Sequence, residues 1–269
     1  YFLNGRFRLV FYFTKNKWGK MNVKPLVPID PRGLDEIAES LLAGTPEPPS
    51  DSPRATRVAN PNYYLILPGK TYGTYSYPDL LVPTARTHLN ENWEQCSQGV
   101  MQESSLMLTL RQYADFLSHL KAGKVYNGTG TKVDSGKITS LLDDILTVRN
   151  PYRAEWLDAK FSRSGMISKQ WSITYHKIKS NGTLEKVTEP LQECLREDKT
   201  PGIDLDYWLS HATNQGLPPK NNTSGSLYYW HPRAGAVARF GADSDGVRLS
   251  CDGNPTDSNP GLGVRAAKI

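Results

Sequence analysis

The side chains of this sequence that could act as nucleophiles or hold a soft metal are few and widely spaced. The cysteines, Cys96, Cys194 and Cys251, are odd in number and form no C-x-x-C pair, which argues against a disulfide framework and against a zinc site. The histidines follow no metal-ligand or catalytic spacing, and H-E-x-x-H is absent. We therefore expect buried free thiols, with no bound metal and no cofactor.

Carboxylates near the C-terminus suggest a second kind of chemistry. Asp243 and Asp245, with Asp252 and Asp257 further along, resemble a calcium loop because hard cations prefer clustered oxygen ligands. The run lacks the spacing of an EF-hand and its terminal Glu. A structural calcium ion therefore stays an open alternative.

Motifs for phosphate binding or hydrolysis are missing from the sequence. It contains no glycine-rich phosphate loop, no G-x-S-x-G elbow and no kinase signature set, and Gly128-Thr129-Gly130 is expected to be a turn. The N-x-[ST] triplets beginning at Asn127, Asn181, Asn221 and Asn222 need no explanation beyond chance. These observations predict a protein that is not an enzyme.

The net charge of +5 is concentrated at the N-terminus. Residues 1–24 carry six Lys or Arg and no acid, which leaves 26 bases against 27 acids in the remainder. A near-neutral body has no broad basic face for a phosphate backbone, so we expect no nucleic-acid partner. The apolar run Arg8–Phe13 is too short to cross a bilayer, which needs about 20 residues. It is expected to be either a strand or translated sequence upstream of a start at Met21.

The elements that would position these groups begin after a proline-rich arm. Residues 21–60 predict a linker, with a short amphipathic helix at residues 34–42 behind Pro31. Tyr63–Leu67, followed by Pro68-Gly69, predicts the first strand of the folded body. The expected organisation is an N-terminal extension, residues 1–59, partly flexible, and one domain, residues 60–269.

Helices precede strands in the body, which is typical of an α+β fold. Apolar residues at helical spacing predict helices over Leu106–Leu120, ended by Gly123, and over Ser135–Val148, ended by Asn150-Pro151. A short helix is expected at Ile203–Leu209. Strands are expected at the ranges Trp156–Phe161, Trp171–Ile178, Thr183–Val187, Leu227–Trp230 and Leu262–Ala267, with Ser180-Asn181-Gly182 as a hairpin turn.

The segment Ala234–Val264 is rich in small polar residues, and its composition alone predicts a loop. So long a loop in a compact domain is unusual and is either functional or disordered. Short apolar anchors recur through it, and a strand sequence closes it. We therefore expect brief strands to hold the loop at both ends, which favours a functional loop.

The C-terminal residues resemble the variable proteins of diversity-generating retroelements, most of all the archaeal-virus members. The likeness lies in Leu227–Trp230, Val237–Phe240 and Leu262–Lys268, and Trp156–Ala159 resembles the first domain strand of that family. The resemblance implies a C-type lectin-like fold, with two helices, antiparallel strands and a loop-rich C-terminal region. It also implies a hypervariable, ligand-binding segment at about residues 234–261.

In that family, adenines of the gene are replaced at random, so that Lys, Glu, Gln, Met and Trp cannot appear at the diversified Asn codons. Those five types form roughly a sixth of this chain, so about five would be expected in Ala234–Val264, and none occurs. The resemblance implies variable, ligand-binding positions at Gly241, Asp243, Asp245, Gly246, Arg248, Ser250, Asp252, Gly253, Asn254, Asp257, Asn259 and Gly261. The scaffold around them is expected to be Trp230, Arg239, Phe240, Leu249, Leu262 and Arg265.

These expectations combine into a ligand- or receptor-binding protein, displayed on a virion or a cell surface, whose partner would be a protein on a target cell. Affinity would come from a few hot-spot residues, with Arg248 first and Arg239 and Tyr229 at the rim. One alternative is a structural or attachment protein of the same fold without diversification. A less favoured alternative is an enzyme of the formylglycine-generating type, which needs two cysteines near the C-terminus where this sequence has Cys251.

Overall fold

The computed structural model describes residues 14–15, 21–22, 60–164, 170–222 and 224–269 of the chain. The chain divides into two compact units, Tyr1–Ser50 and Asp51–Ile269. In the first unit, β1 (Thr14–Lys15) pairs antiparallel with β2 (Met21–Asn22). The run Arg8–Phe13, the proposed linker and the short helix at residues 34–42 fall outside the described residues.

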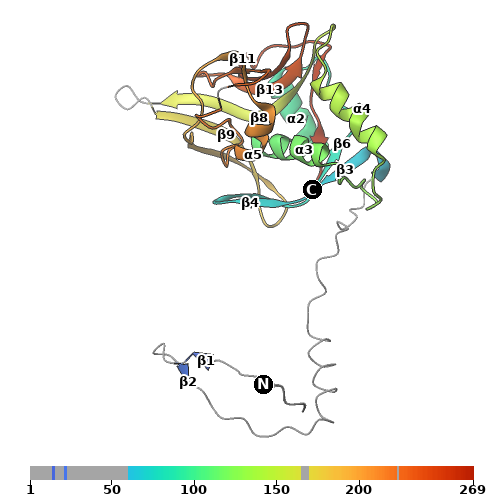
Figure 1. Ribbon diagram of the computed structural model, residues 1–269, viewed down its shortest axis with the longest axis vertical. Coiled ribbons are helices and arrows are strands. Elements are labelled where there is room, and N and C mark those ends of the chain that lie inside the picture. The colour runs from blue at the N-terminus through green and yellow to red at the C-terminus, as the bar shows by residue number, and fades with distance from the viewer. Residues whose placement is uncertain (1–13, 16–20, 23–59, 165–169, 223) are drawn as a thin grey trace, which may run out of the picture. The chain divides into compact units, whose positions relative to one another are not determined.

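An eight-stranded sheet organises the second unit (Figure 1). Seven strands follow one another in the order β10-β9-β8-β13-β14-β12-β11, and β15 pairs with β8. Their bounds are β8 Arg153–Ser164, β9 Gln170–Ile178, β10 Leu184–Pro190, β11 Lys199–Ile203, β12 Leu227–Trp230, β13 Val237–Ala242, β14 Val247–Gly253 and β15 Leu262–Gly263. Neighbouring strands are antiparallel except for the parallel pairs β12–β14 and β15–β8.

Helices α3 (Leu110–Ala122) and α4 (Ser135–Leu146) confirm the two amphipathic helices predicted from apolar spacing. Thr109 caps α3 through a reciprocal capping box with Gln112, and Gly123 ends it in the left-handed conformation at φ 71°. The predicted start of that helix at Leu106 is wrong, because Leu106–Met107 forms β7. Strand hydrogen bonding to β16 (Ala266–Ala267) outweighs the helical spacing there.

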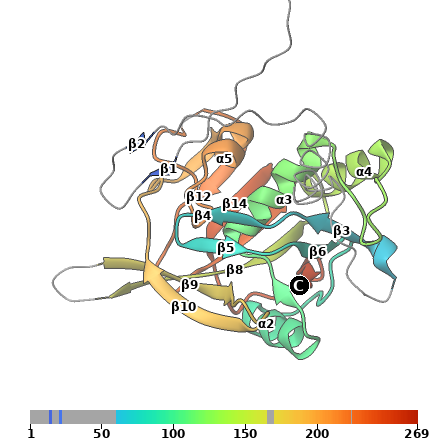
Figure 2. The same cartoon turned by 90° about the horizontal axis from the view of Figure 1, so that it is seen from below.

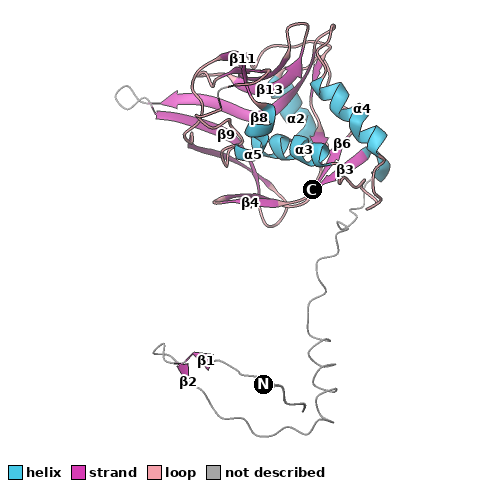
Figure 3. Ribbon diagram, viewed as in Figure 1, coloured by secondary structure: helices cyan, strands magenta, loops and turns pink. Residues whose placement is uncertain are grey.

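The short helix predicted after Pro201-Gly202 is α5 (Leu205–His211), capped by Asp204. Helix α3 lies between α5 and α4 (Figure 2). A further helix, α2 (Trp93–Gln102), was not predicted. The described residues therefore form a mixed α+β fold with mostly antiparallel sheets (Figure 3), as predicted.

Three small pairings complete the second unit, and the pairing of β7 with β16 is one of them. Strand β3 (Tyr64–Leu67) pairs with β6 (Leu80–Pro83), and β4 (Lys70–Tyr72) pairs with β5 (Tyr75–Tyr77). The C-terminal residues return to this region, where a bridge joins Lys268 to Leu81. The predicted C-terminal strand is thus present only as the two short pieces β15 and β16.

The central sheet separates two apolar clusters. The larger one holds the inward side chains of α3, α4 and α5 together with alternate residues of β8, β13 and β14, such as Phe161, Phe240 and Leu249. The smaller one lies on the opposite face and gathers Trp93, Trp156 and the C-terminal Leu262 and Val264. Among the described residues, no helix is long and apolar enough to span a membrane.

Candidate functional site

The segment Ala234–Val264 is more regular than its composition predicted. Instead of a long loop held by brief strands, it contributes β13 and β14 to the middle of the sheet, and β14 lies between β13 and β12. The hydrogen bonds of β8 and β12 supply the pairing that small polar residues do not favour by themselves. Residues 234–236, the turn at 243–246 and the stretch 254–261 lie outside strands.

Side chains of β14 alternate between the core and the opposite side of the sheet. Leu249 and Cys251 are fully buried in the larger cluster, whereas Arg248 and Asp252 are only partly buried and point the other way. Phe240 of β13 pairs with Leu249 and is buried with it. The apolar anchors therefore hold the backbone of both strands, as the sequence predicted.

On the side of the sheet opposite the larger apolar cluster, β12, β13 and β14 carry what we call the outer face. It comprises Tyr228, Trp230, Arg239, Arg248, Ser250 and Asp252. The strand register arranges it in two rows across the sheet. Gly241, Arg248 and Tyr228 form one row, and Arg239, Ser250 and Trp230 form the other. Tyr228 and Arg248, 20 positions apart in the sequence, are thus brought side by side.

Aromatic rings and a guanidinium group pack together on the outer face. The rings of Tyr228 and Trp230 meet edge to face with centroids 5.8 Å apart, and the guanidinium of Arg248 lies 5.1 Å from the centroid of Trp230. Trp230 was expected to be scaffold, but it is partly exposed beside Arg248. Aromatic residues next to arginine are the side chains most often found at binding hot spots.

Arginines of the outer face form ion pairs with three carboxylates of the adjoining turns. Arg248 forms an ion pair with Asp243 and a longer one, 3.8 Å, with the exposed Asp245. Arg239 pairs with Asp257 at 3.1 Å. Asp252 forms no ion pair with any described residue, and burial raises the pKa of its carboxyl group. Because these acids face arginines, they do not converge on a common point as calcium ligands would.

Several predicted variable positions stabilise turns. Asp243 accepts hydrogen bonds from the backbone N–H groups of Asp245 and Gly246, at 3.0 and 3.3 Å. Asn254 accepts from the backbone of Thr256, and Asn259 from that of Gly261. Such Asx turns are local backbone supports. A change at these three positions would alter the shape of the turn as well as the surface.

Three glycines of the predicted variable set have no room for a side chain, which corrects that part of the prediction. A Cβ atom at Gly241 would lie 2.5 Å from that of Ala154, and one at Gly261 would lie 1.9 Å from the carbonyl oxygen of Tyr152. At Gly253 it would lie 2.9 Å from the carbonyl oxygen of Val237. Gly246 is different, because there the nearest atoms belong to Tyr228 at ordinary contact distance.

Two further positions differ from the expectation. Ser250 lies on the outer face but is only 3% exposed, because it sits between Arg239 and Trp230. Tyr229, expected at the rim of the site, is fully buried and donates a hydrogen bond to the carbonyl oxygen of Leu195. Its neighbours Tyr228 and Trp230 are the ones that face outward, and strand alternation in Leu227–Trp230 could have identified them.

The remaining scaffold residues are buried as expected. Leu262 belongs to the smaller apolar cluster. Arg265 is 2% exposed, with its Nε 2.9 Å from a carboxylate oxygen of Glu155 and its Nη1 donating to the carbonyl oxygens of Pro83 and Thr84. This arginine fastens the C-terminal segment to the body of the fold.

The cysteines are buried, in agreement with the prediction of free thiols. Burial raises the pKa of Cys96 to about 12 and that of Cys194 to about 11, and it raises the pKa of Cys251 well above its ordinary value. Cys194 is near enough to Cys251 to contribute to that shift, a neighbourhood that the sequence did not reveal. Within the described residues, no three His, Cys, Asp or Glu side chains form a group that could hold a metal ion.

Comparisons with family models, with curated proteins and with solved structures find no match to this chain.

Proposed function

We propose that this protein binds a ligand, a protein on a target cell, through the outer face and its adjoining turns. We further propose that the fold is C-type lectin-like and that a diversity-generating retroelement varies this surface. The observation that carries the proposal is the alternation along β14, where Leu249 and Cys251 are buried while Arg248 and Asp252 face away from the core. Such an arrangement separates the residues that keep the fold from those that meet a partner.

The geometry narrows the proposed variable set. Positions without room for a side chain, or buried, are removed from it: Gly241, Gly246, Ser250, Gly253 and Gly261. The proposed contact positions are then Asp243, Asp245, Arg248, Asp252, Asn254, Asp257 and Asn259, with Tyr228 and Trp230 beside them as fixed aromatic anchors. This set lies on one side of three neighbouring strands and in the turns that leave them.

Support for the C-type lectin-like fold comes from α3 and α4 packed on a mostly antiparallel sheet, and from a C-terminal segment that returns to the start of the domain. The expected loop-rich C-terminal region is less extensive than the resemblance implies, because β13 and β14 are full strands. The fold assignment therefore depends on topology and on the resemblance of Trp156–Ala159 and Leu227–Trp230.

Two display libraries test the separation of fold from surface. One randomises Asp245, Arg248 and Asp252, and the matched library randomises Phe240, Leu249 and Cys251, which are buried on the same strands. We expect most clones of the first library to resist protease, because surface changes usually cost within about 0.5 kcal/mol. Most clones of the second should be digested, because cavities or overpacking cost about 1 to 5 kcal/mol each. Equal survival of the two libraries would contradict the proposal.

A second candidate, an attachment protein of the same fold without diversification, is favoured by the turn-forming roles of Asp243, Asn254 and Asn259. The DNA around the gene separates the two. Retroelement diversification requires a reverse-transcriptase gene and a near-copy of the final coding segment that differs only opposite adenines. If both are absent and isolates share one outer-face sequence, the undiversified attachment protein is the better account.

A further inference from the structure

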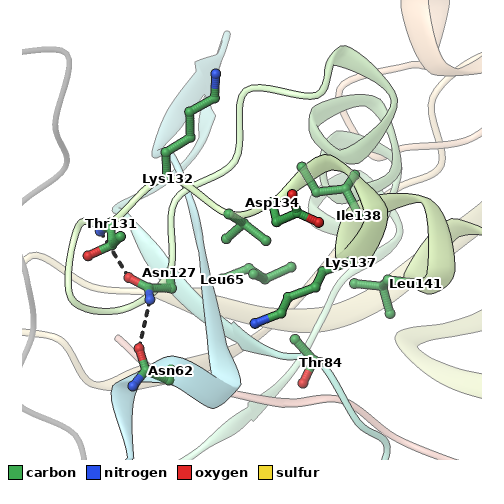
Figure 4. Close-up of a pocket in the computed structure, with 11 residues that line it drawn as sticks. Asn62, Leu65, Thr84, Asn127, Thr131, Lys132, Asp134, Lys137, Ile138 and Leu141 are labelled. Atoms are coloured by element: carbon green, nitrogen blue, oxygen red, sulfur yellow. Dashed lines mark hydrogen bonds between the residues drawn. The ribbon is translucent and has the colours of Figure 1, made fainter.

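A cavity of about 470 Å³ lies between the start of α4, β3 and the turn at residues 127–132 (Figure 4). The other end of α4 is the one close to the 243–246 turn, which adjoins the outer face. Arg149, just after the end of α4, is the residue that hydrogen-bonds the 243–246 turn, whereas the cavity borders the first turn of the helix. Its volume lies within the range of pockets that hold small molecules, roughly 300 to 1,000 Å³.

Apolar side chains form the floor of the cavity. Leu65 of β3 and Ile138 and Leu141 of α4 are at most 9% exposed, and Val133 adds a fourth apolar wall. A molecule that occupies the cavity would therefore have to bury an apolar part against them.

The side-chain amide of Asn127, on the wall of the cavity, is already hydrogen-bonded at both ends. Asn127 donates from Nδ2 to the side-chain oxygen of Asn62 at 2.7 Å, and its own oxygen accepts from the backbone of Thr129 and Thr131 (Figure 4). The carboxylate of Asp134 accepts from the backbone N–H of Gly136. These groups shape the wall and leave the selection of a ligand to other side chains.

Lys137 provides the charge. Its side chain extends over the floor toward Thr84, whereas Lys132 points away from the cavity (Figure 4). Among the described residues, neither lysine forms an ion pair, and the carboxylate nearest to them along the chain is that of Asp134, which lines the same cavity. Lys137 also lies in the first turn of α4, where the helix dipole disfavours an additional positive charge. An apolar floor below an ammonium group that forms no ion pair with a described carboxylate fits a ligand with an apolar body and one negative charge.

We propose that this cavity binds a small amphipathic anion, whose apolar body lies on Leu65, Ile138 and Leu141 and whose anionic group meets Lys137. This inference is independent of the proposed function, because the cavity shares no residue with the outer face.

Titration of the full-length protein with octanoate, followed by backbone amide chemical shifts, tests the proposal. We expect saturable shifts at residues around the cavity. Neutral n-octanol should bind at least about tenfold more weakly because it lacks the charge, and acetate because it lacks the apolar body. The outer-face amides should not move.

Two matched variants test whether Lys137 provides the positive charge that binds the anion. Lys137→Gln should weaken octanoate binding about tenfold, whereas Lys132→Gln, the same change of charge on the side chain that points away, should change it less than about twofold. Lys137→Arg should keep the binding, which separates a loss of charge from a loss of folding. The proposal is overturned if octanol binds as tightly as octanoate, if both Gln variants have equal effects, or if the shifts lie elsewhere.

Discussion

At the scale of single residues, the glycines near the candidate site differ in whether a methyl group would fit beside them. Gly241 faces the backbone and Cβ of β8 so closely that no larger residue fits, whereas Gly246 meets only the ring of Tyr228 at contact distance. Neither glycine has a positive φ. The difference between the two is therefore one of packing and not of backbone conformation.

The pair Gly241→Ala and Gly246→Ala tests this difference with one chemical change. We expect Gly241→Ala to lower the free energy of unfolding by about 1 to 3 kcal/mol, because the new methyl group overlaps β8. Gly246→Ala should change it by no more than about 0.5 kcal/mol. Urea denaturation of both variants measures this, and equal losses would show that close packing does not restrict position 241.

At the scale of elements, regular apolar spacing was enough to predict α3 and α4, and Gly123 marked the end of α3 correctly. Helix α2 was missed because few of its residues are apolar. A signal was nevertheless present, because Asn92 and Gln95 form a capping box around the start of the helix.

The sequence predicted which side chains of the candidate site point toward the core, but it did not predict which strands lie next to one another. The positions of Phe240 and Leu249 as inward anchors follow from the period of a strand. The contact of Arg248 with Trp230 depends on the parallel pairing of β12 with β14, and the closeness of Gly241 to Ala154 depends on β13 packing beside β8. Sequence patterns within one strand contain no information on which strands become neighbours.

The same sheet contains an electrostatic link between β8 and β9 whose strength depends on pH. Nδ1 of His176 lies 3.1 Å from the carboxylate of the buried Asp158, which also accepts the backbone N–H of His176 at 2.7 Å. The hydrogen bond to Asp158 raises the pKa of His176 above its ordinary value of 6.5, against the opposing effects of burial and of Lys186. A raised pKa in the folded state stabilises the fold fully below the unfolded pKa, and this contribution is lost as pH rises through the folded pKa.

His176→Gln should therefore destabilise the protein more at pH about 6 than at pH about 8.5, where the wild-type histidine has lost its proton. Thermal denaturation of both proteins across this range provides the measurement. His211→Gln is the matched control, because His211 is exposed at the end of α5, stacks on Tyr207 and forms no ion pair with a described residue. A stability difference for His176→Gln that stays constant with pH would contradict the link.

At the scale of the whole domain, the C-terminal segment is held by strands that are distant in sequence. Leu262 and Gly263 pair with β8, Val264 bridges to Thr87, and Ala266 and Ala267 pair with β7. A buried ion cluster reinforces this connection. Glu155 of β8 faces both Arg153 and Arg265, and all three side chains are at most 2% exposed. The C-terminal segment, which follows the outer face in the sequence, is thereby fixed to β8, the first strand of the large sheet along the chain.

Glu155→Gln should lower the free energy of unfolding by on the order of 3 kcal/mol, because it leaves the buried guanidinium of Arg265 without a charged partner. Glu185→Gln is the matched control, since Glu185 pairs with Lys179 at 3.3 Å on the exposed β9–β10 hairpin and such pairs contribute at most about 1 kcal/mol. Hydrogen exchange then locates the effect. If Glu155 fastens the segment, exchange in Glu155→Gln should accelerate at Val264 and Ala267 while α3 keeps its protection. Uniform acceleration over the whole domain would instead mean that the cluster stabilises the fold globally, and the C-terminal segment would not be an independently released part of it.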